Sequence, residues 1–162
     1  MKKSLFLTLV LLVIPSIGAI DIKLSDFNLN ETWVRENGIG ERVSLESIRG
    51  KATIQAYFQT WCSDCIREIP TLIQLKEKLN NPDVKIIMVT DESIEKVNKF
   101  KKRFPLFKQS YFIAEKSMRE LDIKKFPTTV LLDRKGNVKL VTYEGHDWSN
   151  EQSMDLVTKL LK

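Results

Sequence analysis

Two kinds of hydrophobic pattern alternate along the chain, one typical of buried strands and one typical of amphipathic helices. Residues 52–58 and 84–89 are short apolar runs rich in β-branched and aromatic side chains, which predicts two strands. The second run is nearly continuous and indicates burial on both faces. Between them, apolar side chains recur at helical spacing from Ile66 to Leu79, with an expected kink at Pro70, and residues 80–83 end that helix.

The rest of the chain divides into shorter elements separated by turn residues. A Lys-Gly-Asn turn lies between the apolar runs 128–133 and 138–143, which is a strong hairpin signal, and residues 150–161 have the pattern of a closing amphipathic helix. Other short elements are expected as strands over 26–29, 42–45 and 111–113 and as helices over 92–103 and 118–123.

The first 19 residues have a pattern of their own. A basic start at Met1–Lys3 is followed by an almost wholly apolar run to Ile14 and by small residues around Gly18 and Ala19. This is typical of a secretory signal peptide, and the run is shorter than the roughly 20 residues that a spanning helix needs. We expect residues 1–19 to be a signal peptide, with an uncleaved N-terminal anchor as the alternative. Residues 20–162 then form one exported domain.

Composition narrows the classes of protein that fit. The chain has 162 residues, 43% of them hydrophobic, which is enough for a real core without disulfide staples. The formal net charge is +5, and Lys2 and Lys3 contribute two of these charges, so nothing favours nucleic-acid binding. Two cysteines exclude a disulfide-dense scaffold and a four-cysteine zinc site.

Those two cysteines are the strongest chemical signal. Cys62 and Cys65 lie in the run Trp61-Cys62-Ser63-Asp64-Cys65, where a buried strand is expected to end and a helix to begin. Unpaired N–H groups at a helix N-terminus stabilise a thiolate on the first cysteine. That thiolate attacks a substrate disulfide, and the second cysteine resolves the mixed disulfide. A loop this short gains little as a structural staple.

Together with other parts of the sequence, these residues match a known family over nearly all of the chain after the first 19 residues. The chain resembles the thioredoxin-like family, in its TlpA/ResA-type branch of exported thiol–disulfide oxidoreductases. The matching pieces are residues 43–45 with 50–51, Tyr57-Phe58, 61–65, Glu68 with Pro70, Phe126-Pro127-Thr128-Thr129 and 130–136. The resemblance implies an α/β, thioredoxin-like fold: a central mixed β-sheet flanked by helices, an N-terminal β extension, and a strand–helix insertion over 110–122 before a cis-proline.

The resemblance also implies roles for residues outside the cysteine pair. The family proline that matches Pro127 is cis and packs beside the cysteines, which exposes the backbone of Phe126 to a substrate segment. We therefore expect Trp61, Phe126, Pro127 and Thr128 to bind substrate. Sequence alone supports a cis bond weakly, since only roughly 5–6% of X–Pro bonds are cis.

Glu68 follows Cys65 by about one helical turn and could share its face of the helix. The resemblance assigns the matching glutamate to proton handling. Thioredoxin itself uses a buried Asp on the preceding strand, where this chain has Ala56. The alternative is a surface glutamate with no part in the chemistry.

Asp64 departs from the family pattern, because many relatives have proline before the second cysteine. An acid there opposes a thiolate on Cys62, and a pair whose thiolate is less stabilised is more reducing. The leading hypothesis is therefore an exported reductant of protein disulfides, in the periplasm or on the extracytoplasmic face of the membrane.

The expected partners follow from this hypothesis. They are protein disulfides, such as an apocytochrome in cytochrome c maturation, and a membrane or periplasmic electron donor. No organic cofactor, no metal and no nucleic acid are expected; the redox group is the Cys62–Cys65 disulfide, and the chain is expected to be a monomer.

Two alternatives stay open. One is a copper or metal chaperone that uses Cys62, Cys65 and His146, although His146 also fits a loop histidine without a catalytic part. The other is a thioredoxin-fold thiol peroxidase, which we discount because Thr60 is two residues before Cys62 and no proline accompanies it.

Overall fold

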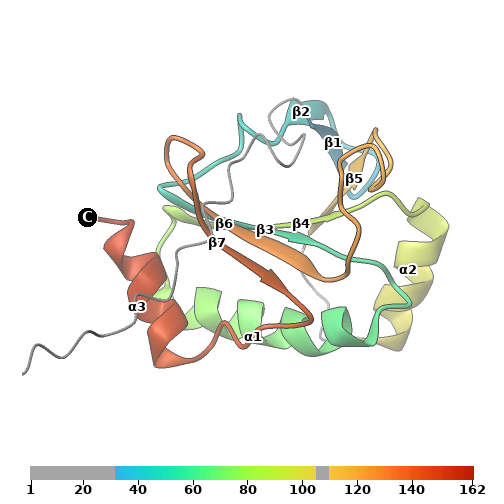
Figure 1. Ribbon diagram of the computed structural model, residues 1–162. Helices are drawn as coiled ribbons and strands as arrows, with labels where there is room; N and C mark the ends of the chain where they lie inside the picture. Colours follow the sequence, from blue (N-terminus) through green and yellow to red (C-terminus); the bar gives the residue numbers. More distant parts are fainter. Residues whose placement is uncertain (1–31, 105–109) are drawn as a thin grey trace, which may run out of the picture.

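The computed structural model describes residues 32–104 and 110–162, and a mixed seven-stranded sheet forms the centre of these residues (Figure 1). Neighbouring strands are parallel in the pairs β3–β4 and β4–β5 and antiparallel in the other pairs. In spatial order the strands are β2 (Arg42–Ser44), β1 (Trp33–Glu36), β5 (Tyr111–Ala114), β4 (Val84–Thr90), β3 (Ala52–Tyr57), β6 (Thr128–Asp133) and β7 (Val138–Tyr143).

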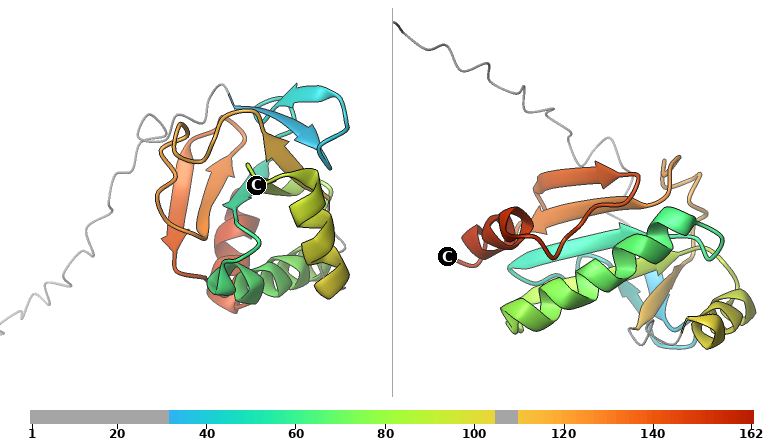
Figure 2. Two further views of the ribbon diagram at one scale, coloured as in Figure 1. Left: turned by 90° about the vertical axis from the view of Figure 1, so that its right-hand side faces the viewer. Right: turned by 90° about the horizontal axis from the view of Figure 1, so that it is seen from below.

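Three helices pack on one face of this sheet: α1 (Ser63–Leu79), α2 (Ile94–Arg103) and α3 (Glu151–Lys159). Two successive parallel steps, β3 to β4 and β4 to β5, carry α1 and α2 across the same face, as right-handed crossovers require. One buried cluster joins residues of all three helices to β3 and β4. The view from below in Figure 2 shows α1 crossing in front of the sheet. The expected α/β fold is confirmed.

A second buried cluster lies on the opposite face, where the connection from β5 to β6 crosses the sheet. Part of that connection, residues 118–123, was expected to be a short helix, and this is wrong. The segment is a hydrogen-bonded turn, in which the Ile123 N–H donates to the Met118 carbonyl at 2.8 Å and Asp122 has φ 59°. A residue in the left-handed region ends a helix. Met118, Leu121 and Ile123 are nevertheless buried, as the apolar pattern indicated.

The longest helix begins at the cysteine motif. Cys62 is the N-cap of α1, with extended backbone angles, and Asn80 is its C-cap in the left-handed conformation. Pro70 lies inside α1, and the helix continues past it to Leu79. Asn80 thus ends the helix where the sequence predicted, because asparagine tolerates the left-handed angles that a C-cap requires.

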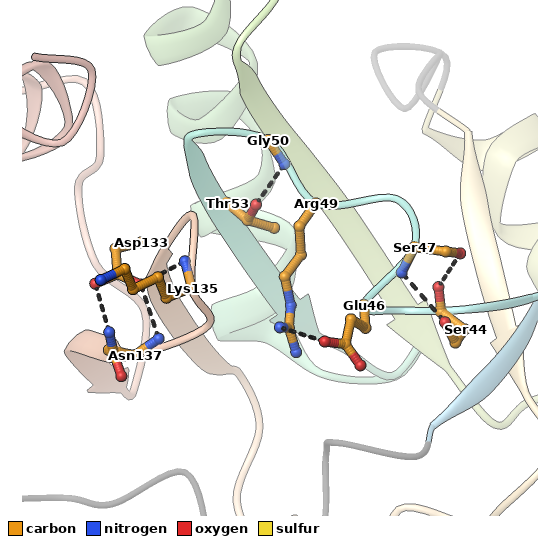
Figure 3. A network of polar contacts seen from close by, with 9 residues as sticks. All are labelled: Ser44, Glu46, Ser47, Arg49, Gly50, Thr53, Asp133, Lys135 and Asn137. Carbon is orange, nitrogen blue, oxygen red and sulfur yellow. Dashed lines mark hydrogen bonds and ion pairs between the residues drawn. The ribbon is translucent and has the colours of Figure 1, made fainter.

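A polar network closes the end of the sheet remote from the cysteines (Figure 3). The Asp133 carboxylate accepts the backbone N–H groups of Lys135 and Asn137, both at 2.9 Å, and so caps the β6–β7 turn. Gly136 has φ +84°, and a Cβ there would overlap Nη1 of Arg49. The Arg49 guanidinium, 3.9 Å from Glu46, therefore packs against the hairpin.

One strand was missed by the sequence analysis, and two expected segments lie outside the described residues. β1 was not predicted, because only Val34 of its four residues is buried. The expected strand over 26–29 and the signal peptide over 1–19 lie outside the described residues. Within residues 32–104 and 110–162, no helix has the length and apolar character needed to cross a membrane.

Candidate active site

The cysteine pair lies at the carboxyl end of β3, where the chain turns into α1. Cys62 and Cys65 form a disulfide with their Cα atoms 5.3 Å apart. The Cys65 backbone N–H points at Cys62 Sγ, 3.1 Å away. Cys62 is 5% exposed and Cys65 is 1% exposed. On reduction, the same N–H and the helix N-terminus can stabilise a thiolate on Cys62.

The loop that carries Trp61 and Cys62 is held by two acids that the sequence analysis missed. The buried Glu92 carboxylate accepts the Thr60 N–H at 2.6 Å and the Thr60 hydroxyl at 3.1 Å. Asp91 accepts the Gln59 side-chain amide at 2.6 Å. Both acids directly follow β4, which neighbours β3. Side chains at the carboxyl ends of adjacent parallel strands meet at one edge of the sheet. The position of the two acids directly after a predicted strand was therefore the sequence signal that could have indicated them.

Glu68 is buried, so the alternative of a surface glutamate is wrong. Its side chain is 3% exposed and reaches from α1 to β6 and to the loop before α3. Oε2 accepts the Thr129 hydroxyl at 3.0 Å, and Oε1 accepts the Trp148 indole N–H at 2.8 Å. Thr129 lies opposite Ala56 in the β3–β6 register. The carboxylate therefore reaches the strand residue paired with the position at which thioredoxin has its aspartate.

Burial raises the pKa of Glu68 above the ordinary glutamate value, because a charged carboxylate loses its hydration there. Hydrogen bonds from the Trp148 side chain, the Thr129 side chain and the His146 backbone oppose this shift by stabilising the charged form. Three donors thus offset part of the effect of burial on the pKa, and a carboxyl group whose pKa is raised holds a proton more readily than an exposed glutamate does.

Trp61 and Phe126 form an aromatic rim beside the cysteines. The Phe126–Pro127 bond is cis, as expected. Trp61 is 70% exposed, and its ring meets the half-buried Phe126 ring edge-on with centroids 5.8 Å apart. Pro127 and Thr128 are buried, and the Thr128 hydroxyl donates to the Lys125 carbonyl at 2.8 Å. The aromatic surface beside the cysteines therefore comes from Trp61 and Phe126, while the Thr128 hydroxyl bonds within its own loop.

Asp64 and His146 each have a partner that the sequence did not predict. Asp64 forms an ion pair with Arg67, one turn further along α1, so its charge is partly offset. His146 Nε2 lies 2.8 Å from the Ser153 hydroxyl on α3, and its ring meets Trp148 edge-on. Burial lowers the pKa of His146, and Asp147 opposes that shift.

The metal-chaperone alternative needs Cys62, Cys65 and His146 to converge. In the described part of the chain, no three His, Cys, Asp or Glu side chains are grouped so that they could hold a metal ion. His146 instead bonds to Ser153, and the two sulfurs bond to each other. The structure therefore does not bring these three residues together as a metal site.

The chain is similar to several known proteins. Residues 20–141 match the AhpC/TSA family. The chain is 29% identical over 101 residues to the thiol–disulfide oxidoreductase ResA of Bacillus cereus, a match that covers 61% of this chain and 58% of that protein. It is 28% identical over 134 residues to ResA of Halalkalibacterium halodurans, covering 80% of this chain and 73% of that protein.

The fold has close counterparts among solved structures. The thioredoxin domain of a thiol–disulfide oxidoreductase from Bacteroides vulgatus superposes with a TM-score of 0.65 at 20% identity. The superposition covers 83% of this chain and 96% of that domain. The fold is therefore thioredoxin-like, as the resemblance implied.

Proposed function

This chain belongs to the AhpC/TSA family, and we propose that it is a thiol–disulfide oxidoreductase that acts on protein disulfides through Cys62 and Cys65. One observation carries the proposal: the cysteine pair caps the N-terminus of α1, with the Cys65 N–H aimed at Cys62 Sγ. A sulfur in that position is the better thiolate of the two, so Cys62 is the nucleophile and Cys65 the resolving thiol.

The first chemical step forms a mixed disulfide. In the reduced chain, the Cys62 thiolate attacks one sulfur of a substrate disulfide, and a bond forms between Cys62 Sγ and that sulfur. The substrate S–S bond breaks, and the other substrate sulfur leaves as a thiolate that takes a proton from solvent. Trp61 and Phe126 provide the exposed apolar contact for the substrate segment at this stage. Pro127 and Thr128 hold the loop that carries Phe126.

The second step releases the reduced substrate. The Cys65 thiol passes its proton to the Glu68 carboxylate, and the Cys65 sulfur attacks Cys62 Sγ. The Cys62–Cys65 bond forms, the mixed disulfide breaks, and the second substrate sulfur leaves as a thiolate and is protonated. Two electrons move from the pair to the substrate. Glu68 suits this role because its burial and its three donors act on its pKa in opposite directions.

We propose that the physiological direction is reduction, because Asp64 places a negative charge next to the Cys62 thiolate. The pair then needs electrons from a membrane or periplasmic donor and no organic cofactor. The pattern of residues 1–19 supports export, and an apocytochrome in cytochrome c maturation is the client class that we propose.

Trapping tests the proposal directly. Cys65→Ser should accumulate a mixed disulfide between Cys62 and client proteins, since the resolving thiol is absent. The matched control is Cys62→Ser, which lacks the proposed nucleophile and should trap almost nothing. Complexes are separated on non-reducing gels and identified by mass spectrometry after reduction. Equal trapping by both variants would show that Cys62 is not the nucleophile, and no trapping by either would contradict the exchange activity.

A further inference from the structure

The two oxygens of the Glu68 carboxylate have partners of different chemistry. Oε1 accepts the indole N–H of Trp148 at 2.8 Å, and Oε2 accepts the hydroxyl of Thr129 at 3.0 Å. Trp148 is fully buried, and Thr129 is also fully buried within β6. Water therefore has little access to either partner, and each hydrogen bond is made by the protein itself.

These partners respond differently when a proton arrives. An indole N–H can only donate, so an oxygen that faces it must remain an acceptor. A threonine hydroxyl rotates about its C–O bond and can either donate or accept. An acid O–H on Oε2 can therefore donate to Thr129 once that hydroxyl turns its hydrogen away. An acid O–H on Oε1 would weaken the hydrogen bond from the indole, because the hydroxyl oxygen of an acid is a poorer acceptor than its carbonyl oxygen.

We propose that Oε2 of Glu68 carries the proton during thiol–disulfide exchange, with Trp148 holding Oε1 as a permanent acceptor and Thr129 reversing its hydroxyl as the proton arrives and leaves. The proposal rests on the proposed function of Glu68 as the proton acceptor for Cys65. Trp148 and Thr129 are positioning residues, because they act on the reacting thiol through Glu68.

The proton balance is simple. The Cys65 S–H bond breaks, an O–H bond forms at Oε2, and the hydroxyl of Thr129 changes from donor to acceptor without losing its hydrogen. The proton then leaves Oε2 for solvent and Thr129 donates again. A cleft of about 150 Å³ beside Glu68 offers the way out, and it is lined by Arg67, Glu68, Thr71, Gly145, His146 and Asp147.

The groups around the carboxylate come from each element packed on it. α1 presents Arg67 and Thr71 in the cleft beside the carboxylate, and the loop before α3 presents His146 and Asp147. β6 presents Thr129, and Ala56 of β3 lies opposite it. The His146 backbone also hydrogen-bonds to Glu68 and supports the charged form. Trp148 and Thr129 are both neutral, so replacing either one alters the hydrogen bonds of the Glu68 carboxylate without changing the charge nearby.

The test is a titration of the Glu68 carboxyl carbon by 13C NMR in the reduced protein, with the signal identified by its absence in Glu68→Gln. Trp148→Phe removes a donor that stabilises the charged form more than the neutral acid, because a carboxylate oxygen accepts more strongly than the acid carbonyl, so the pKa of Glu68 should rise by about one unit. Thr129→Val removes a hydroxyl that serves both forms, so the pKa should move by less than about half of that. Thr129→Ser should titrate like the wild type.

Trp33→Phe is the matched control, because it makes the same chemical change on β1, which lies between β2 and β5 and away from β6, and should leave the titration unchanged. Equal upward shifts in Trp148→Phe and Thr129→Val would overturn the assignment, since Thr129 would then be a fixed donor. No shift in folded Trp148→Phe would overturn it as well.

A second readout covers the case in which Trp148→Phe does not fold. The infrared C=O stretching band of protonated Glu68 should move in Thr129→Val and not in Thr129→Ser. An unmoved band in Thr129→Val would overturn the assignment without any variant of Trp148.

The two proposals can fail separately. If the titrations behave as stated but Glu68→Gln reduces disulfides at the wild-type rate, the proton-acceptor role fails and the oxygen assignment stands. If Glu68→Gln is slow but the two shifts are equal, the oxygen assignment fails and the role stands.

Discussion

Asp64 and Arg67 decide how strongly the charge between the cysteines acts on Cys62. The two side chains are ion-paired, but that of Arg67 is 73% exposed, so the pair screens the acid only in part. Asp64→Asn should therefore lower the thiol pKa of Cys62 and make the pair more oxidising by about 10–20 mV. Arg67→Gln, which leaves Asp64 unpaired, should shift the potential in the opposite direction. Equilibration with glutathione buffers measures both.

The wild-type potential from the same titration tests the proposed direction. A value near the roughly −120 mV of a strong oxidant such as DsbA would contradict a reductant. A shift of Asp64→Asn toward a more reducing potential would show that its negative charge does not oppose the thiolate.

Among individual residues, spacing along one helix predicted Cys62, Cys65 and Glu68 as candidate catalytic residues. Thr129 and Trp148 were not predicted as partners of Glu68, because they lie 61 and 80 residues away along the chain. Sequence spacing reports neighbours within one helix or strand, whereas these contacts depend on how β6 and the loop before α3 pack against α1.

The β6–β7 hairpin shows what turn chemistry contributes to an element. Gly136→Ala should lower the free energy of unfolding by about 1–2 kcal/mol, because φ +84° disfavours a side chain and the new Cβ would meet the Arg49 guanidinium. Urea denaturation measures the loss. Lys135→Ala in the same turn is the control, since only the backbone of Lys135 bonds to Asp133. A Gly136→Ala protein as stable as the wild type would contradict this account.

The elements that were predicted correctly are those with strong local signals. The hairpin was expected over 128–133 and 138–143, and these are the bounds of β6 and β7. β1 was missed because its exposed residues gave no apolar pattern. Residues 118–123 were mistaken for a helix because their apolar spacing fits one turn, and periodicity over one turn does not distinguish a helix from a capped turn.

For the molecule as a whole, the buried Glu68 should cost stability when it is charged. Its pKa is raised by burial in the folded chain, so its contribution to stability is fully present below the ordinary value of 4.5 and is lost as pH rises through the folded value. Glu68→Gln should therefore melt at a higher temperature than the wild type at pH 8, with both proteins oxidised. The difference should shrink steadily toward pH 4. A constant difference, or a less stable variant at pH 8, would contradict the linkage.

The overall architecture was accessible from the order of strands and helices, because a strand–helix–strand unit restricts the sheet to few topologies. The contacts that Asp91 and Glu92 make with Gln59 and Thr60 were missed, because these partners lie in the loop after a different strand and sequence position alone does not identify them. Function in this molecule thus depends on contacts that only the assembled sheet provides.

The long separations within the site also bear on how it forms during folding. The two cysteines are three residues apart, so their bond needs only local structure. Glu68 acquires its partners only after Thr129 and Trp148 have docked, and these lie 61 and 80 residues further along the chain. Because distant contacts close later than local ones, the cysteine pair should exist before the buried surroundings of Glu68, its proposed proton acceptor, are in place. A nascent chain that ends before Thr129 would hold an oxidisable cysteine pair without the carboxylate environment that proton transfer requires.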